Sequence, residues 1–198
     1  MKKILVLGVT GSFGSGKTTV AAILRTFGAE IIDADRIAHR CYRPGSAAYK
    51  KIVALFGRDI LGRDKSIERK KLGSKVFSDK RLLKKLNAVV HPQVKSIIRD
   101  KIRRAKRKVV VVDAPLLIET GLEGIVDKLI VVKINRLEQL SRAGKREPLS
   151  RTQILKRVNA QWPLQRKVVL ADFIIDNNGT RRETKRQIKN IWRELWKN

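Results

Sequence analysis

Gly11-Ser12-Phe13-Gly14-Ser15-Gly16-Lys17-Thr18 is the stretch of this chain that decides its fold. It fits the pattern G-x-x-x-x-G-K-[ST], in which glycines let backbone N–H groups wrap around phosphate groups. An apolar run at residues 4–9 predicts a strand directly before the pattern, and helical spacing up to Gly28 predicts a helix directly after it. This setting distinguishes the pattern from a chance match in a glycine-rich turn. We therefore predict a phosphate-binding loop at the N-terminus of a helix.

The residues of this loop are expected to bind the phosphates of ATP. The Lys17 ammonium should reach the β and γ phosphates, and the Thr18 hydroxyl should bind Mg²⁺. The residues expected to contact ATP in this stretch are Gly11, Gly14, Ser15, Gly16, Lys17, Thr18 and Thr19. GTPases, motors and small-molecule kinases share such loops, but the chain has no N-K-x-D guanine signature and is short for a motor. A kinase for a metabolite or nucleotide, with mobile arginines that close over the phosphates, is therefore favoured.

Five apolar runs rich in β-branched residues predict the strands of one sheet. They lie at residues 4–9, 30–32, 109–112, 129–134 and 173–175. Strands that are apolar throughout and are separated by helices are typical of a parallel sheet covered on both faces. We predict an α/β fold of the P-loop NTPase type, with a parallel five-stranded sheet flanked by helices.

Two intervals between these strands are too long for simple connections. The basic, mostly helical interval 36–107 predicts an insertion that binds the acceptor substrate. The Arg/Lys-rich interval 136–161 predicts a small helical lid. The nucleotide-binding core would then consist of residues 1–35, 108–135 and 162–198.

The ends and faces of the later helices also carry signals. Capping boxes are predicted for three pairs, which are Asn135 with Glu138, Ser150 with Gln153, and Thr180 with Glu183. The last helix should dock on the core through apolar residues that share one face, which are Ile188, Ile191, Trp192, Leu195 and Trp196.

The chain is strongly basic, with 46 Lys and Arg against 18 Asp and Glu and a formal net charge of +28. Such an excess indicates anionic partners such as nucleotides, phosphorylated metabolites or nucleic acid. The densest stretch, 95–108, is also what a solvated helix face would show. Zinc-finger, KH and RNP patterns are absent, and aromatic residues make up only 5% of the sequence. Nucleic-acid binding is therefore not expected, although a nucleic-acid-binding ATPase stays open as the weaker alternative.

The cysteine content and the N-terminus bear on the cellular compartment. The one cysteine, Cys41, excludes an intramolecular disulfide and a cysteine-rich zinc site. The N-terminal apolar run is too short for a secretion signal, and a membrane span would need about 20 apolar residues. We expect a cytoplasmic protein with no membrane segment, and the sequence leaves its oligomeric state open.

Further motifs stand in order along the chain. They are Asp33-Ala34-Asp35, Pro44-Gly45, Arg69, His91-Pro92, Asp113-Ala114-Pro115-Leu116-Leu117-Ile118-Glu119, Gln139 with Arg142 and Arg146, Gln161, and Asn177-Asn178-Gly179. Together with the phosphate loop, these motifs resemble the dephospho-CoA kinase family along nearly the whole chain. Two departures stand out: the family usually has Gly-Ile at Ser12-Phe13, and Asp-Gly at Asp64-Lys65.

The resemblance implies transfer of the γ-phosphoryl group of ATP to the 3′-hydroxyl of dephospho-CoA, with Mg²⁺ as cofactor. It implies catalytic roles for Lys17, Asp35 and Arg142, with Asp35 holding and deprotonating the acceptor hydroxyl. Asp33 is expected to hold Mg²⁺ through water. Asp113 is either a further carboxylate on the metal side or a structural hydrogen-bond acceptor. A helix-capping role stays open for Asp33 and Asp35.

The remaining site residues follow from the same resemblance. Arg142 and Arg146, one helical turn apart, are expected to direct both guanidinium groups at the transferring phosphate, unless they are simply exposed helix arginines. Asn177 is expected in a loop on the adenine side, with a plain turn as the alternative. The acceptor-binding residues are expected to be Asp35, Arg69, His91, Pro92 and Leu116. Pro92 should stand at the first position of a helix and hold His91 at the helix entrance, although a packing role for His91 stays open.

Overall fold

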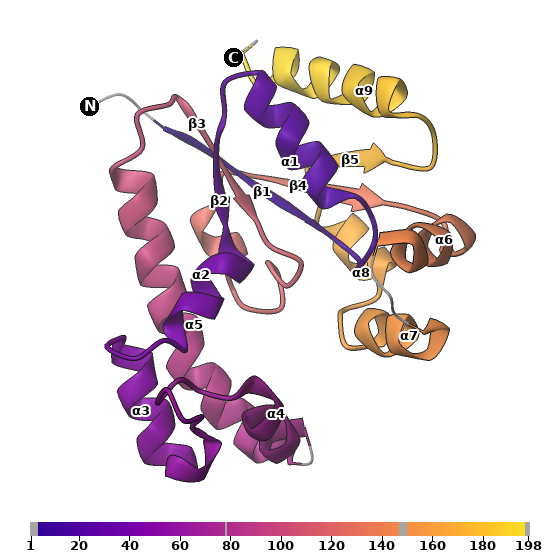
Figure 1. Cartoon of the computed structure of the whole chain (residues 1–198). Coiled ribbons are helices and arrows are strands. Elements are labelled where there is room, and N and C mark those ends of the chain that lie inside the picture. Colours follow the sequence, from indigo (N-terminus) through magenta and orange to yellow (C-terminus); the bar gives the residue numbers. More distant parts are fainter. Residues whose placement is uncertain (1–3, 78, 147–149, 197–198) are drawn as a thin grey trace. The chain divides into compact units, whose positions relative to one another are not determined.

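A computed structural model gives the fold of residues 4–77, 79–146 and 150–196 (Figure 1). The chain divides into two compact units, a smaller one at Ala34–Lys101 and a larger one made of Met1–Asp33 and Ile102–Asn198. The larger unit contains the sheet, and the smaller unit is helical.

The larger unit is built on a sheet whose strand pairs are all parallel, in the order β2-β3-β1-β4-β5. Its strands are β1 (Leu5–Gly11), β2 (Glu30–Asp33), β3 (Val109–Asp113), β4 (Lys128–Lys133) and β5 (Phe173–Asp176). The prediction of a parallel five-stranded sheet is confirmed, and β1 extends beyond residue 9 to Gly11.

Helices and loops cover both faces of this sheet. The helices of the larger unit are α1 (Lys17–Thr26), α6 (Arg136–Arg146), α7 (Arg151–Asn159), α8 (Leu164–Val169) and α9 (Arg181–Glu194), with a 3₁₀ turn η2 (Glu123–Ile125). On one face, Leu7 and Val9 of β1 pack in a cluster with side chains of α1 and α9, which lie side by side (Figure 1). On the other face, Leu117 and Val126 lie against Gly8. Coverage on both sides explains why β1 and β3 are buried almost end to end.

The last helix docks as predicted, except at its end. Ile188 and Ile191 are buried in the core cluster, and Trp192 and Leu195 pack against it. Trp196 lies beyond the end of α9 and is 49% exposed, so the prediction that it docks on the core is wrong. Its ring lies 6.3 Å from that of Trp192, which packs against the cluster.

Two of the three predicted capping boxes are confirmed, at Ser150 with Gln153 and at Thr180 with Glu183. Asn135 caps α6, because its Oδ1 accepts the Glu138 N–H at 2.8 Å. The prediction of a reciprocal bond from the Asn135 N–H to the Glu138 side chain is wrong. The Asn135 N–H donates to Asn178 Oδ1 at 2.7 Å, and the Glu138 carboxylate accepts from Arg142 instead. A neighbouring loop therefore supplies the acceptor that the box would have supplied.

The smaller unit consists of α2 (Ala34–Cys41), α3 (Ala47–Phe56), a 3₁₀ turn η1 (Arg58–Ile60), α4 (Arg69–Phe77) and α5 (Lys80–Arg103). The N-terminus of α3 is fixed by its cap Ser46 and by Gln93 of α5, whose Oε1 accepts the Ala48 N–H at 2.6 Å. Pro92 lies inside α5, so the prediction that it starts a helix is wrong. The buried residues Leu86, Val90, Val94 and Ile98 continue at a spacing of four through the proline, and this apolar stripe keeps the helix in one piece.

Candidate active site

The phosphate loop runs from the end of β1 into α1 and is closed by its own lysine. Lys17 Nζ donates to the carbonyl oxygens of Gly11 at 3.1 Å and Ser12 at 3.0 Å. The Ser15 N–H also donates to the Ser12 carbonyl, at 3.1 Å. These bonds hold the loop around the Lys17 side chain, and Lys17 is only 9% exposed.

Two glycines of the loop stand where a side chain would be both strained and crowded. Gly11 has φ 153° and Gly16 has φ 89°, both in the region that favours glycine. A Cβ at Gly11 would strike the Val132 carbonyl of β4, and a Cβ at Gly16 would strike Nδ2 of Asn177. The sequence pattern therefore reflects close backbone packing as well as phosphate binding.

Asn177, at the end of β5, supports this loop from behind. Its Nδ2 donates to the Ser15 carbonyl at 2.8 Å, and its Oδ1 accepts from the Thr184 hydroxyl of α9 at 2.8 Å. The residue is 5% exposed. Both ends of its amide are thus used within the protein, and its contact with adenine stays a prediction.

Arg142 lies on α6 next to the same segment. Its Nη1 donates to the Asn177 carbonyl at 2.8 Å, and its Nε donates to the Glu138 carboxylate at 3.0 Å. Its guanidinium is therefore placed beside the loop that follows β5. Arg146 ends α6, and its side chain lies outside the described residues, so the predicted convergence of the two guanidinium groups stays a prediction.

Two carboxylates stand at the carboxyl edge of the sheet. Asp33 and Asp113 are register partners at the ends of β2 and β3, and Asp113 also pairs with Val9 of β1, shortly before the phosphate loop. Thr18 is exposed in the first turn of α1. Within the described residues no group of three or more His, Cys, Asp or Glu could hold a metal ion. Hydroxyl and carboxylate oxygens, few in number, nevertheless fit Mg²⁺, which keeps several waters and takes its other ligands from substrate phosphates.

A model of the dephospho-CoA kinase family matches residues 5–183. The chain belongs to the dephospho-CoA kinase family. It is 44% identical over 193 residues to the dephospho-CoA kinase of Geobacillus kaustophilus, with 96% of each chain covered. It is 43% identical over 195 residues to that of Carboxydothermus hydrogenoformans, covering 97% of this chain and 94% of the relative.

Solved structures agree with this assignment. A crystal structure from Thermus thermophilus superposes with a TM-score of 0.86 at 34% identity and covers 98% of this chain and 99% of that one. Dephospho-CoA kinase from Campylobacter jejuni superposes with a TM-score of 0.68 at 28% identity, with 96% of each chain covered. A shikimate kinase from Bacteroides thetaiotaomicron, at 12% identity and a TM-score of 0.54, shares the fold alone.

The family motifs are divided between the two units. The phosphate loop, Asp33, Asp113, Leu116, Arg142 and Asn177 belong to the larger unit. Leu116 follows β3 and is 38% exposed. Asp35, Arg69, His91 and Pro92 belong to the smaller unit.

Within the smaller unit the predicted acceptor residues have defined surroundings. Asp35 is exposed in the first turn of α2. Arg69 Nη1 lies 3.1 Å from His39 Nε2, and its guanidinium lies 6.0 Å from the centre of the Tyr42 ring. His91 is half-buried in α5, and this burial lowers the pKa of its ring and favours the neutral form. The sequence reasoning missed His39 and Tyr42, although His39 stands on α2, the helix that begins within the D-A-D motif, and Tyr42 follows directly after its last residue.

A buried ion pair that the sequence reasoning also missed holds the segment after β3. Lys167 Nζ of α8 is fully buried and lies 2.7 Å from both Glu119 Oε1 and the Pro115 carbonyl. The Trp162 N–H donates to the same Glu119 oxygen at 2.9 Å. The glutamate of the family motif D-x-P-L-L-x-E thus has a structural partner here, and a lone lysine in a helix gave no signal of it.

Proposed function

We propose that this protein transfers the γ-phosphoryl group of ATP to the 3′-hydroxyl of dephospho-CoA, giving coenzyme A and ADP. The observation that carries the proposal is the phosphate loop around Lys17, in a chain that belongs to the dephospho-CoA kinase family over nearly its full length. Phosphoryl transfer of this kind depends mainly on positioning and on neutralising charge, and the proposed residues supply both.

The larger unit would hold ATP. Lys17 leaves the loop carbonyls to bind the β and γ phosphates, and loop N–H groups cradle the same phosphates. Arg142 and Arg146 add positive charge as it is needed in the transition state. The guanidinium of Arg142 already lies on the loop that follows β5, and this favours a position beside the bound nucleotide.

The carboxylates would divide the remaining work. Thr18 and Asp33, with Asp113 as a further oxygen donor, would hold Mg²⁺, which supplies charge neutralisation at the phosphates. Asp35 would orient the 3′-hydroxyl and accept its proton. One residue, Ala34, separates Asp33 from Asp35, so their Cα atoms lie at most about 7 Å apart, and the proposed base stays close to the proposed metal ligand along the backbone.

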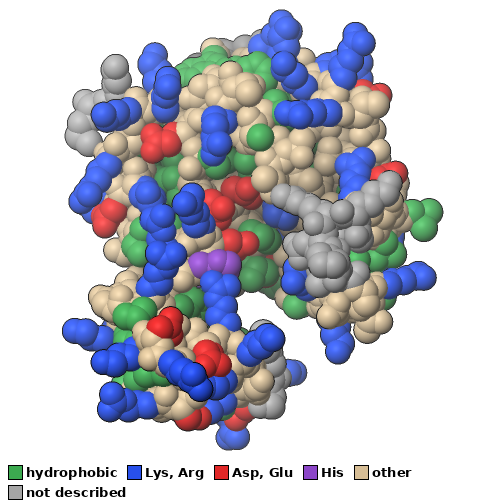
Figure 2. Space-filling model, in the orientation of Figure 1, with side chains coloured by type: hydrophobic (Ala, Val, Ile, Leu, Met, Phe, Trp, Pro, Cys, Tyr) green, Lys and Arg blue, Asp and Glu red, His purple; other side chains and the backbone are tan. Residues whose placement is uncertain are grey.

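The acceptor would be bound largely by the smaller unit. Arg69 offers a guanidinium for its pyrophosphate, and the neutral His91 ring offers a hydrogen bond without added charge. Leu116, exposed after β3, offers an apolar contact. Nucleic acid is not an expected partner. Figure 2 shows Lys and Arg side chains spread over the visible face and not gathered in one patch.

An acceptor panel tests the proposal directly. Purified protein is given Mg·ATP and either dephospho-CoA, AMP, shikimate or pantothenate, and formation of ADP is followed. ADP should form rapidly only with dephospho-CoA, and the product should be coenzyme A by mass. Lys17→Ala should abolish turnover, whereas Lys189→Ala, on the exposed face of α9, should leave it unchanged. Faster turnover with another acceptor, or full activity of folded Lys17→Ala, contradicts the proposal.

A further inference from the structure

The tip of the phosphate loop is held from two sides by glutamines that do not belong to the loop. The Phe13 N–H donates to Gln161 Oε1 at 2.7 Å, and the Phe13 carbonyl accepts from Gln139 Nε2 at 2.6 Å. Gln139 Nε2 also lies 2.9 Å from the Ser12 hydroxyl oxygen. Both backbone polar groups of Phe13 are therefore bound by side chains from outside the loop.

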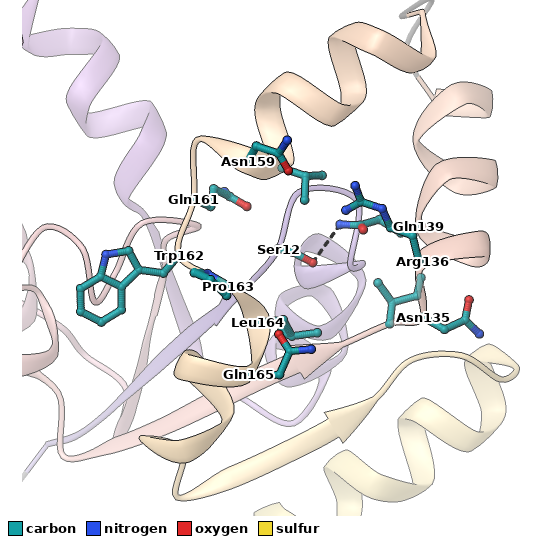
Figure 3. A pocket seen from close by; sticks show the side chains of 12 residues that line it. Ser12, Asn135, Arg136, Gln139, Asn159, Gln161, Trp162, Pro163, Leu164 and Gln165 are labelled. Atoms are coloured by element: carbon teal, nitrogen blue, oxygen red, sulfur yellow. Dashed lines mark hydrogen bonds between the residues drawn. The ribbon is translucent and has the colours of Figure 1, made fainter. Parts of the chain in front are cut away.

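A pocket lies beside this tip. Ser12, Gln139 and Gln161 border a cavity of about 570 Å³, and Figure 3 shows the two glutamines on either side of Ser12. Phe13 also has a contact of a weaker kind, since the Arg157 guanidinium of α7 lies 5.1 Å from the centre of its ring.

The hydrogen bond to the Phe13 carbonyl has a consequence for the next residue. A peptide unit is planar and trans, so its C=O and the following N–H point in opposite directions. When Gln139 holds the Phe13 carbonyl, it also sets the direction of the Gly14 N–H, one of the loop groups expected to bind phosphate. Donors that are oriented before the substrate arrives need no reorganisation during the reaction.

We propose that Gln139 and Gln161 are positioning residues for phosphoryl transfer, which orient the N–H groups of the phosphate loop by holding the peptide units around Phe13. The proposal rests on the proposed function, because it assigns these residues to the same reaction. Neither glutamine contacts the reacting atoms in this scheme, and both act through the loop.

The two glutamines hold Phe13 in opposite ways, and this gives a sharp test. Gln139 acts as a donor, whereas Gln161 acts as an acceptor. A glutamate can replace the acceptor but cannot replace the donor. Gln161→Glu should therefore keep its bond to the Phe13 N–H, and Gln139→Glu should place a carboxylate against the Phe13 carbonyl. Gln165→Glu is the matched control, because exposed Gln165 lines the same cavity and the variant adds the same charge.

The measurements are kcat and KM for ATP with dephospho-CoA, and the Kd of Mg·ADP by calorimetry. Gln139→Glu should lower kcat/KM for ATP about tenfold or more, the size expected when a carbonyl loses its donor. Gln161→Glu should match Gln165→Glu, within about twofold of the wild type. Gln161→Leu, which removes the acceptor, should lower kcat/KM for ATP to a similar extent as Gln139→Glu. If Gln139→Glu does not fold, Gln139→Met removes the donor without adding charge and carries the same expectation.

Two outcomes overturn the proposal. They are a Gln139→Glu variant that matches Gln165→Glu, and a Gln161→Leu variant that matches Gln161→Glu. Failure of the proposed function is seen separately, as wild-type protein that binds Mg·ADP but forms no ADP from ATP and dephospho-CoA. In that case the order of the Mg·ADP affinities among the variants still decides whether the glutamines position the loop.

Discussion

Asn177 connects the phosphate loop to two helices through single hydrogen bonds. Its side chain joins Ser15 of the loop to Thr184 of α9, and its carbonyl accepts from Arg142 of α6. A buried amide is suited to this position because it donates at one end and accepts at the other without carrying a charge. The lack of room for a Cβ at Gly16 follows from the same amide.

We expect Asn177→Asp to destabilise the protein by about 2–4 kcal/mol at neutral pH, because a buried carboxylate would face the Ser15 carbonyl. The loss should shrink as the pH is lowered. Burial raises the pKa of the new carboxyl group, and its protonated form can donate to Ser15 again. Urea unfolding at several pH values measures this, with Asn190→Asp on the exposed face of α9 as control. A loss that is equal for both variants, or constant with pH, contradicts the argument.

Sequence reasoning reached the residues of the phosphate loop because their chemistry is local. It did not reach Gln139 and Gln161 as loop supports, since their partners lie 126 and 148 positions away in the chain.

The backbone at Lys65 explains why the family usually has glycine at this position. Lys65 has φ 62°, a conformation that suits glycine better than lysine. Its carbonyl is held by the Tyr49 hydroxyl at 2.6 Å.

Helix α5 shows how packing decides an element against a local rule. A proline inside a helix removes one backbone hydrogen bond and crowds the preceding turn, and this favours reading Pro92 as a helix start. In α5 the proline is exposed, while Leu86, Val90, Val94 and Ile98 are buried on both sides of it. The spacing of four was visible in the sequence and would have identified the continuous helix, had it been weighed against the proline.

We expect Pro92→Ala to raise the free energy of unfolding by about 1–3 kcal/mol, because it restores a backbone donor in the middle of a helix. The greater freedom of the unfolded chain reduces this gain by about 0.4–1 kcal/mol. The KM for dephospho-CoA should rise at the same time, since a change in the backbone of this turn moves the neighbouring His91 ring. Denaturant unfolding and steady-state kinetics measure the two effects, with Lys84→Ala on the exposed side of α5 as control. A less stable Pro92→Ala variant would mean that the proline supports the helix.

At the scale of the whole molecule, the sheet was predictable and the ordering of its strands was not. Apolar runs such as that of β3 indicate buried parallel strands, because both faces of such a strand pack against other side chains. Nothing in those runs states that β1 lies between β3 and β4, since this order depends on contacts between distant segments. Within the described residues no helix has the length and apolar character needed to cross a membrane.

The net charge of +28 makes the dependence of stability on salt a test of the whole molecule. Most of the described ion pairs are partly exposed, such as those of Lys128 with Asp172 and Lys133 with Asp176, and pairs of this kind contribute little. Repulsion among the excess of Lys and Arg should therefore outweigh the attraction within these pairs. Salt shortens the reach of both, from about 30 Å at 0.01 M to about 10 Å at 0.1 M.

We therefore expect the melting temperature to rise with NaCl, by about 2–4 °C for each kcal/mol of repulsion removed. Sodium sulfate at equal ionic strength should raise it further, because sulfate also binds at the phosphate loop and stabilises the folded state by mass action. Lys17→Ala separates the two effects: it should keep the full chloride response and lose the additional sulfate response that comes from the loop. A melting temperature that falls with NaCl would mean that attraction between opposite charges dominates, and an unchanged sulfate response in Lys17→Ala would place anion binding away from the loop.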